Sequence, residues 1–320
     1  MENNKQLAIV IPAYKVDYID ETLASVAAQT CRNFTVYVCN DAGSRDIGTI
    51  VSRYSDAVDI VYRRYDDNIG GRDLVEAWNR ALSMMADEPF FMLFSDDDVM
   101  EPTCIARFYD ELSAHPDHDV YHFNISIIDS RSRVIISREG FPTVLSALDF
   151  YIKNNIRGEI DVRMPEFIFR TSAFHNAGGF VSFPLAMHTD NATVMSVADS
   201  RGILTIDGPR VRWRISPQHI SGSRSQPRQK HIQYLEADVS FNNWLYDRYF
   251  PLLSAKDKHA QRLMTLRIFA DPERAVTIRQ RREMLLRITD MSKRPYLAPL
   301  IPLLWAMKKV RRLFVKPVDD

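Results

Sequence analysis

Apolar and polar residues follow one another in a regular block pattern over the first 119 residues. Four short apolar runs each precede a segment whose apolar residues recur every three or four positions. The apolar runs cover residues 7–11, 34–40, 58–62 and 90–94, and the segments with helical spacing cover residues 19–27, 44–54, 74–82 and 105–112. Strands that alternate with helices in this way predict an α/β fold with a mainly parallel sheet and helices on both faces.

The pattern is less regular after residue 119. Two apolar runs, 120–128 and 133–137, predict an antiparallel hairpin. The remaining predicted elements are helices at 147–152 and 189–199 and strands at 167–169, 203–206 and 210–215. A polar loop rich in Gly, Ser and Pro spans 216–229, and the chain after it has helical spacing. We therefore predict a domain over residues 1–222, with halves 1–119 and 120–222, and a helical region over 223–320.

Composition places the chain among ordinary globular proteins, because 46% of its 320 residues are hydrophobic and 26% are charged. The three cysteines, Cys31, Cys39 and Cys104, lack metal-ligand spacing and suggest a reducing compartment. The apolar run at 7–11 is too short for a signal peptide, and the run at 296–307 is too short to span a bilayer. These features predict a cytoplasmic protein.

The charge is unevenly divided along a chain whose net charge is zero. Residues 1–119 contain 10 Lys and Arg against 22 Asp and Glu, whereas residues 256–316 contain 16 against 5. The segment 296–316 combines apolar residues, a tryptophan and a basic cluster, which suits peripheral contact with the anionic inner face of a plasma membrane. A helix that packs on the first domain with a solvated basic face is the alternative. No other feature supports nucleic-acid binding.

Carboxylates follow two of the predicted strands. Asp41 comes after the run at 34–40, and Asp96, Asp97 and Asp98 come directly after the run at 90–94. The carboxyl ends of parallel strands meet at one edge of a sheet, where ligands bind. Adjacent carboxylates repel unless water or a cation compensates them. A solvated acidic turn is one interpretation; a site for Mg²⁺ or Mn²⁺ with a phosphorylated ligand is the other.

The order of short motifs resembles the family-2 glycosyltransferases, which have the GT-A (Rossmann-like) fold. The motifs are "IPAYK" (11–15), "QT" (29–30), "NDAGSRD" (40–46), "NIGG" (68–71) and "FSDDDVMEP" (94–102). The resemblance is strong over residues 6–115 and weaker to about residue 215. It implies a mixed, mainly parallel sheet, here with a helical C-terminal extension, and a nucleotide-diphospho-sugar donor.

The resemblance assigns donor-binding roles to several positions. Pro12, Ala13 and Tyr14 match the loop that lines the nucleoside pocket. Asp41 matches the aspartate that accepts a hydrogen bond from the base, usually uracil N3–H, which favours a UDP-sugar; an Asx-turn is the alternative.

Two glycines and an arginine of the "NIGG" region add to this group. Gly70 and Gly71 let backbone approach the donor. Arg72 would reach the base or the phosphates, with a surface ion pair as the alternative.

The metal ligands are carried over from the carboxylate motif. Asp97 matches the metal-binding aspartate of the family, and Asp96 matches a residue near the ribose. The first aspartate of the commoner "DSDD" form falls on Ser95 here, so which of the three carboxylates touches the metal stays open. We predict Asp97 and Asp98 as ligands of Mn²⁺ or Mg²⁺, with Asp96 and Asp98 also near the donor.

A general base is expected downstream of "GGF" (178–180), where inverting members of the family carry an "ED" pair. The Glu is replaced by Thr189, and the Asp is retained as Asp190, which we predict to be the base. An acidic residue is also favoured in the first turn of the helix expected at 189–199. Asp161 and Glu166 are next in line.

Three residues near the end of the first domain complete the predicted site. His219 lies in the polar loop, where the resemblance implies a residue that closes over the donor diphosphate or adds a metal ligand. Trp213 and Arg214 would line the acceptor groove, although a core tryptophan is equally consistent with the pattern.

We therefore expect an inverting, metal-dependent glycosyltransferase. It would move a sugar from a UDP-sugar to a hydroxyl of a glycan or lipid-linked acceptor, in the synthesis of a bacterial surface polysaccharide. A non-catalytic nucleotide-sugar-binding protein is the alternative that the missing Glu at Thr189 leaves open. A sugar-nucleotide pyrophosphorylase is weaker, because "IPAYKVDYID" lacks the Gly-rich, basic loop that such enzymes need.

Overall fold

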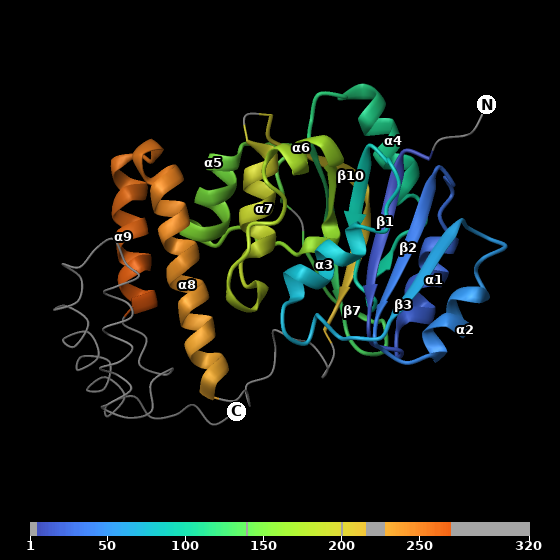
Figure 1. Cartoon of the computed structure of the whole chain (residues 1–320). Coiled ribbons are helices and arrows are strands. Elements are labelled where there is room, and N and C mark those ends of the chain that lie inside the picture. Colours follow the sequence, from blue (N-terminus) through green and yellow to red (C-terminus); the bar gives the residue numbers. More distant parts are fainter. Residues whose placement is uncertain (1–4, 139, 200, 216–227, 270–320) are drawn as a thin grey trace. The chain divides into compact units, whose positions relative to one another are not determined.

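The computed structural model describes residues 5–138, 140–199, 201–215 and 228–269. The chain divides into two compact units (Figure 1). The first comprises Met1–Ser182 and Thr189–Ser223, and the second comprises Phe183–His188 and Arg224–Asp320. The predicted loop at 216–229 falls largely outside the described residues, and so do His219 and the segment 296–316.

The strand–helix alternation predicted for the first 119 residues is confirmed. The elements are β1 (Leu7–Ala13), α1 (Ile19–Ala27), β2 (Phe34–Asp41), α2 (Asp46–Ser52), β3 (Ile60–Tyr65), α3 (Leu74–Leu82), β4 (Phe90–Leu93), β5 (Val99–Met100) and α4 (Cys104–Ala114). Strands β1, β2, β3 and β4 pair in parallel. The two-residue strand β5 had no separate sequence signal.

Burial on both faces explains why β1 reads as a continuous apolar run rather than an alternating one. Successive side chains of a strand point to opposite faces. Leu7, Ile9 and Ile11 belong to a core cluster with apolar residues of α1, α2 and α4. Helix α3 packs on β1 and β2 (Figure 1) and, unlike those helices, contributes nothing to that cluster, which places it on the other face of the sheet.

Ten strands form one mixed sheet, which includes β6 (Val120–Ile128), β7 (Val134–Ser137), β8 (Val144–Leu145), β9 (Phe167–Arg170) and β10 (Ile203–Arg214). The main path runs β3-β2-β1-β4-β9-β6-β10-β5. The chain leaves β1 toward β2 and β3 and then returns to the other side of β1 as β4. The strand order therefore reverses between β1 and β4, and ligands of open α/β sheets bind at such a reversal.

The later part of the first unit confirms the predicted hairpin, because β6 and β7 pair antiparallel. The prediction of two separate strands at 203–206 and 210–215 is wrong. They form the single strand β10, whose pairing with β6 shifts register between Ile206 and Val211. Gly208 lies inside this irregularity with a φ of +102°, and Pro209 follows it; both interrupt the apolar pattern without ending the strand.

Short and irregular elements complete this part of the chain. They are α5 (Ala147–Phe150), η1 (Tyr151–Arg157, a π-helix), η2 (Met164–Glu166), α6 (Thr171–Asn176) and α7 (Thr189–Ala198). The helices predicted at 147–152 and 189–199 correspond to α5 with the start of η1 and to α7. Helix α6 and the single turns were not predicted, because they are too short to show a helical period.

The described part of the second unit is helical, as the sequence predicts. It contains η3 (Pro184–Ala186), α8 (Arg228–Tyr249), η4 (Phe250–Leu252) and α9 (Ala255–Phe269). The His188 ring stacks on Phe241 at 4.5 Å between centroids, and its Nε2 lies 2.9 Å from Asp238 Oδ1. Among the described residues, no helix has both the length and the apolar character that crossing a membrane requires.

Candidate functional site

The carboxylates after β4 lie at the reversal of strand order, and Asp96 joins the two strand ends there. Its Oδ2 accepts hydrogen bonds from the backbone N–H groups of Tyr14 and Lys15, both at 2.8 Å. Asp96 is buried, with 5% exposure, and burial raises its pKa. Two backbone donors and the positive charge of Lys15 act in the opposite direction and favour the ionised form.

Lys15 is a site residue that the sequence analysis missed. Its Nζ contacts Asp97 Oδ2 and lies 3.5 Å from Asp96 Oδ1. Burial would lower the pKa of Lys15, but attraction by Asp96 and Asp97 outweighs it, and the pKa is raised. The ammonium group therefore stays charged and compensates the two adjacent carboxylates.

Asp98 is enclosed in the protein. It has no exposed surface, and its Oδ1 accepts a hydrogen bond of 2.8 Å from the backbone N–H of Arg214. Its Oδ2 is buried and has no hydrogen-bond partner within the part of the chain that the structure describes. Burial, with added repulsion from Asp97, raises the pKa of Asp98 to about 8. Asp98 is thus held by the Arg214 backbone, whereas Asp96 and Asp97 both contact the loop after β1, so the proposal below takes Asp97 with Asp96, rather than the predicted pair of Asp97 and Asp98, as metal ligands.

The residues present are compatible with one divalent cation. Mg²⁺ is commonly held by one or two carboxylates together with substrate phosphates and water. Asp97 and Asp96 can supply that number of carboxylates. Within the ranges that the structure describes, no three His, Cys, Asp or Glu side chains converge as a protein-only metal cluster. The donor set thus fits a cation that arrives with a phosphorylated ligand.

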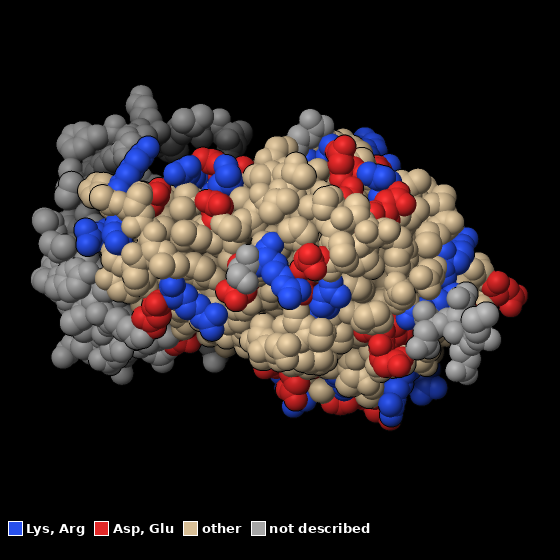
Figure 2. All heavy atoms as spheres, turned by 90° about the horizontal axis from the view of Figure 1, so that it is seen from above, with Lys and Arg blue, Asp and Glu red and all other residues tan. Residues whose placement is uncertain are grey.

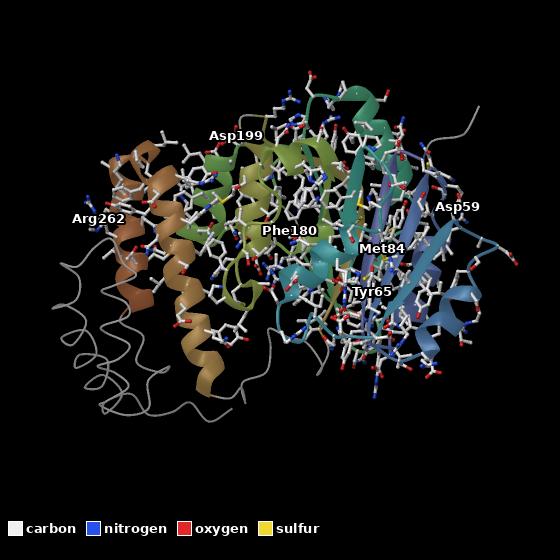
Figure 3. The ribbon with its side chains drawn as sticks, viewed as in Figure 1. Asp59, Tyr65, Met84, Phe180, Asp199 and Arg262 are labelled. Carbon is white, nitrogen blue, oxygen red and sulfur yellow. The ribbon has the colours of Figure 1, made fainter. Side chains whose placement is uncertain are left out.

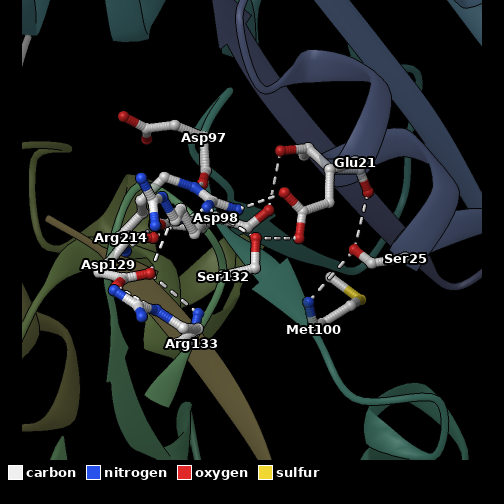
Figure 4. A network of polar contacts seen from close by, with 11 residues as sticks. Glu21, Ser25, Asp97, Asp98, Met100, Asp129, Ser132, Arg133 and Arg214 are labelled. Carbon is white, nitrogen blue, oxygen red and sulfur yellow. Dashed lines mark hydrogen bonds and ion pairs between the residues drawn. The ribbon is translucent and has the colours of Figure 1, made fainter. Parts of the chain in front are cut away.

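Arg214 is the centre of an internal polar network (Figure 4). Its Nη2 donates to Glu21 Oε2 at 2.7 Å, and its Nε donates to the carbonyl oxygen of Asp97 at 2.7 Å. Its Nη1 reaches the carbonyl oxygen of Asp129 and the hydroxyl of Ser132. We predicted that Arg214 lines an acceptor groove. It has no exposed surface, so this structure does not place it there. It instead holds the segment 96–98 in place from its buried side, through its hydrogen bonds to Asp97 and Asp98.

Asp41 is held at the end of β2 by the segment that contains "NIGG". Its carboxylate accepts backbone hydrogen bonds from Ile69 at 3.2 Å and from Gly70 at 2.7 Å, and it pairs with Arg80. A Cβ on Gly70 would lie 2.9 Å from Asp41 Oδ2, so any other residue there would force the Asp41 carboxylate to shift. The Arg80 guanidinium also stacks over the ring of Tyr65 at 4.2 Å (Tyr65 is labelled in Figure 3). Arg80 was not predicted from the sequence.

The other predicted donor residues differ in their exposure. Tyr14 is 54% exposed, whereas Ala13 is fully buried, and Pro12 is intermediate. Gly71 and Arg72 are exposed. The side chains of Tyr14 and Arg72 are therefore available to a ligand, and Ala13 can contribute only through its backbone.

Asp190 lies in the first turn of α7 and belongs to a second group of charged residues. It is half-buried, and its Oδ1 accepts a hydrogen bond of 2.8 Å from the backbone N–H of Asn191. Burial would lower the pKa of Arg163, but Asp161, Glu166 and Asp190 act to raise it, and the pKa is raised overall. The Arg163 guanidinium also lies 4.5 Å from the ring centre of Trp213. Arg163 thus links the predicted base to Trp213, a link that was not predicted.

Glu166 and His122 form a buried pair beside this group. Glu166 Oε2 lies 3.1 Å from His122 Nε2, and neither residue exceeds 1% exposure. Burial raises the pKa of Glu166 well above its usual value and lowers that of His122 to about 3. We infer a neutral pair rather than an ion pair, which makes Glu166 a weaker candidate for the base than Asp190.

Charges of both signs are mixed on the face of the molecule that Figure 2 shows. Lys and Arg side chains there lie next to Asp and Glu side chains.

A family model described as glycosyl transferase family 2 matches residues 8–177, more than half of the chain. The chain belongs to this family. A curated relative from Haemophilus influenzae, an uncharacterized glycosyltransferase, is 26% identical over 144 residues. That match covers 43% of this chain and 40% of the relative, so it spans less than half of the relative's length.

Solved structures confirm the GT-A fold class. S. aureus TarS 1-349 in complex with UDP superimposes with a TM-score of 0.68 at 17% identity, covering 98% of this chain and 94% of that one. Mannosyltransferase PcManGT from Pyrobaculum calidifontis, in complex with GDP-Man and Mn²⁺, gives a TM-score of 0.51 at 14% identity, covering 98% and 81%. At such low identity these likenesses show a shared fold and carry no residue roles.

This family-2 chain departs from the motif pattern at places that the structure now describes. Lys15 follows "IPAY" at the position where the usual start of the family motif, "IPxYN", has Asn, and its ammonium group contacts Asp97. Thr189 replaces the Glu of the "ED" pair; it is fully buried, and its hydroxyl has no hydrogen-bond partner among the described residues. The "GGF" phenylalanine, Phe180 (Figure 3), packs on Trp78 of α3 at 5.4 Å between ring centroids.

Proposed function

We propose that the protein is an inverting glycosyltransferase that transfers a sugar from a UDP-sugar to a hydroxyl group. The observation that carries this proposal is the position of the carboxylates. Asp96 and Asp97 follow β4 and contact the loop after β1, which is where the order of strands in the sheet reverses. Family membership supports the same reaction class.

The donor would lie across the ends of β1, β2 and β4. The base would extend toward Asp41, which the backbone of Ile69 and Gly70 holds in place. These donors and Arg80 leave the Asp41 carboxylate part of its accepting capacity, because two carboxylate oxygens offer about four lone-pair sites. Tyr14 and Arg72 are exposed and would contact the nucleoside and the phosphates.

The leaving diphosphate needs compensation for its charge. Asp97, with Asp96, would hold Mn²⁺ or Mg²⁺, which when bound acts as a Lewis acid toward the leaving phosphate. In this role Asp96 would keep its hydrogen bonds from the backbone of Tyr14 and Lys15, and so would hold the loop after β1 in position beside the metal. Solved GT-A structures contain UDP or UDP-GlcNAc in TarS and GDP-Man with Mn²⁺ in PcManGT.

Asp190 would take the proton of the attacking acceptor hydroxyl, and attack from the face opposite the leaving group would invert the anomeric centre. Its partial exposure leaves it accessible to an acceptor, and it acts electrostatically on the nearby Arg163. Trp213, against which Arg163 packs, would offer an aromatic face to an acceptor sugar. The acceptor would be a glycan or a lipid-linked saccharide of a bacterial surface polysaccharide.

Ligand-dependent melting tests this proposal. A ligand that binds only the folded state raises the melting temperature. We expect UDP-sugars to raise it more than GDP- or dTDP-sugars do, and more with Mn²⁺ than with EDTA. Asp97→Asn should remove the metal effect while the melting temperature without ligand stays close to that of the wild type. If no nucleotide-sugar shifts the wild type, the proposal is wrong; if a donor binds but an acceptor panel releases no UDP, the protein is a non-catalytic binder.

The sequence of residues 296–316 favours a peripheral location at an anionic membrane. We expect the full chain to sediment with anionic vesicles, and less so at high salt, because surface charges are screened over roughly 8 Å at physiological ionic strength. Neutralising Lys308, Lys309, Arg311 and Arg312 together should release it without changing hydrolysis of a soluble donor. Absence of sedimentation in the wild type would favour the packed-helix alternative.

A further inference from the structure

The ammonium group of Lys15 lies beside Asp96 and Asp97, the two carboxylates that a divalent cation would use as ligands. Its Nζ contacts Asp97 Oδ2 and lies 3.5 Å from Asp96 Oδ1, with only 20% of the Lys15 side chain exposed. A Mg²⁺ ion requires oxygen ligands at about 2.0–2.1 Å. The ammonium group and a divalent cation therefore cannot occupy the same oxygens of Asp97 together.

We propose that Lys15 is a tethered counter-ion that competes with the divalent cation for Asp96 and Asp97, so that the cation binds well only together with a diphosphate. The contacts of Asp96 explain why the lysine is placed so closely. Asp96 Oδ2 accepts the backbone N–H of Lys15 itself, so the lysine main chain is anchored directly beside the carboxylates.

A diphosphate resolves this competition because it brings new negative charge to the same place. The ammonium group of lysine sits on a flexible four-carbon stem and can exchange one anionic partner for another. When a nucleoside diphosphate binds together with its cation, the Lys15 ammonium group would pair with the phosphates. Asp96 and Asp97 would then be free to coordinate the cation. Free metal offers Lys15 no such exchange. Lys15 thus couples the binding of metal to the binding of nucleotide.

Titration of Mn²⁺ without nucleotide tests the competition, with free Mn²⁺ measured by electron paramagnetic resonance. We expect Lys15→Met to bind Mn²⁺ at least about tenfold more tightly than the wild type, because a full charge within about 4 Å of the site is removed. Lys15→Asn, which restores the residue of the family pattern, should act in the same direction. Lys15→Arg keeps the charge and should stay near the wild type. Thermal melting of each variant establishes that it is folded.

Lys5→Met is the matched control. Lys5 also pairs with an aspartate, Asp59, at 3.3 Å and has a similar side-chain exposure of 25%, but it lies at the other end of β1. This variant should leave Mn²⁺ affinity unchanged. Equal affinities for Lys15→Met, Lys15→Asn and Lys5→Met would overturn the proposal. So would a gain in Lys15→Met that persists after Asp97→Asn is added, because the metal would then bind elsewhere.

A second titration with UDP present measures the coupling. UDP should raise the Mn²⁺ affinity of the wild type by a larger factor than that of Lys15→Met. The proposal depends on the proposed function only in taking a nucleoside diphosphate as the ligand, and the two can fail separately. A wild type that binds UDP with Mn²⁺ while Lys15→Met gains nothing defeats the competition alone. A gain in Lys15→Met with no nucleotide binding in any variant defeats the proposed function and leaves the competition.

Discussion

The two groups of charged residues in the first unit are held in different ways. The group at the ends of β1, β2 and β4 is fixed mainly by backbone N–H donors: Tyr14 and Lys15 to Asp96, and Gly70 to Asp41. The group around Asp190 depends more on side chains: Arg163 donates to Asp161 and lies 4.5 Å from the ring centre of Trp213, although Asp190 itself accepts the backbone N–H of Asn191.

This difference has a consequence for how each group tolerates change. Backbone donors stay in place when a neighbouring side chain is replaced, because the strand ends position them. Contacts between side chains depend on each partner, and removal of one partner leaves the other without compensation. We therefore expect substitutions at the strand ends to change ligand binding with little loss of fold, and substitutions that break a side-chain network to affect the fold itself.

Asp190→Asn should have the largest effect on activity. A positioned general base typically contributes about a hundredfold to ten-thousandfold, so the transfer rate should fall by that factor while donor affinity is kept. The rate is measured as UDP release with acceptor present, and donor affinity by calorimetry. Asp199→Asn, which changes the exposed residue just after the same helix, is the control and should keep the wild-type rate. Unimpaired turnover in Asp190→Asn would move the base to Asp161 or Glu166.

Arg214→Met should have the largest effect on stability. The variant removes the donor to Glu21 Oε2 and to the carbonyl oxygen of Asp97, and one of the two donors to the carbonyl oxygen of Asp129. Because Arg214 itself has no exposed surface, breaking its network should cost about 3 kcal/mol or more.

Arg212→Met, two residues earlier on β10, removes a guanidinium that is 38% exposed and paired with Glu101 at 2.9 Å. Its loss should stay within about 1 kcal/mol. Urea denaturation measures both free energies of unfolding. Similar small losses in the two variants would contradict the structural role of Arg214.

The sequence predicted the strand-end group better than the Asp190 group, for a physical reason. Apolar runs that end in Asp41 or in Asp96 mark both a buried strand and the place where it stops, so fold and position follow together. Lys15 and Arg80 were missed because a single basic residue in a loop or a helix carries no periodic signal. Both are found only when the fold brings them to Asp97 and Asp41.

Around Asp190, the positions come from elements with little sequence signal. Arg163 precedes the three-residue turn η2, and Trp213 and Arg214 lie beyond the register shift of β10, which decides their faces. The prediction that Trp213 and Arg214 line one groove rested on their neighbouring positions at the end of a strand. Adjacent residues of a strand point to opposite faces, so only one of them can face a ligand. Arg214 is the one that faces inward.

The buried pair of His122 and Glu166 gives the smallest and most specific test of how the second group is held. Burial lowers the pKa of His122 to about 3, whereas an unfolded chain protonates histidine near pH 6.5. Between these values the unfolded state binds the proton and the folded state does not. The contribution of His122 to stability is therefore present above pH 6.5 and is lost as the pH falls toward 3. Glu166, whose pKa burial raises, acts in the opposite sense above pH 4.5.

His122→Gln removes the histidine and keeps Glu166, so the difference between wild type and variant isolates the His122 contribution to first order. We expect the free energy of unfolding of the wild type, relative to the variant, to increase as the pH rises from 3 to 6.5 and to level off above that. Urea denaturation across this range measures the difference, and His175→Gln, which removes an exposed histidine of α6, is the control. A difference that does not change with pH would mean that His122 is protonated in the folded protein. The pair would then be an ion pair, and Glu166 would carry a charge that adds to the field around Asp190.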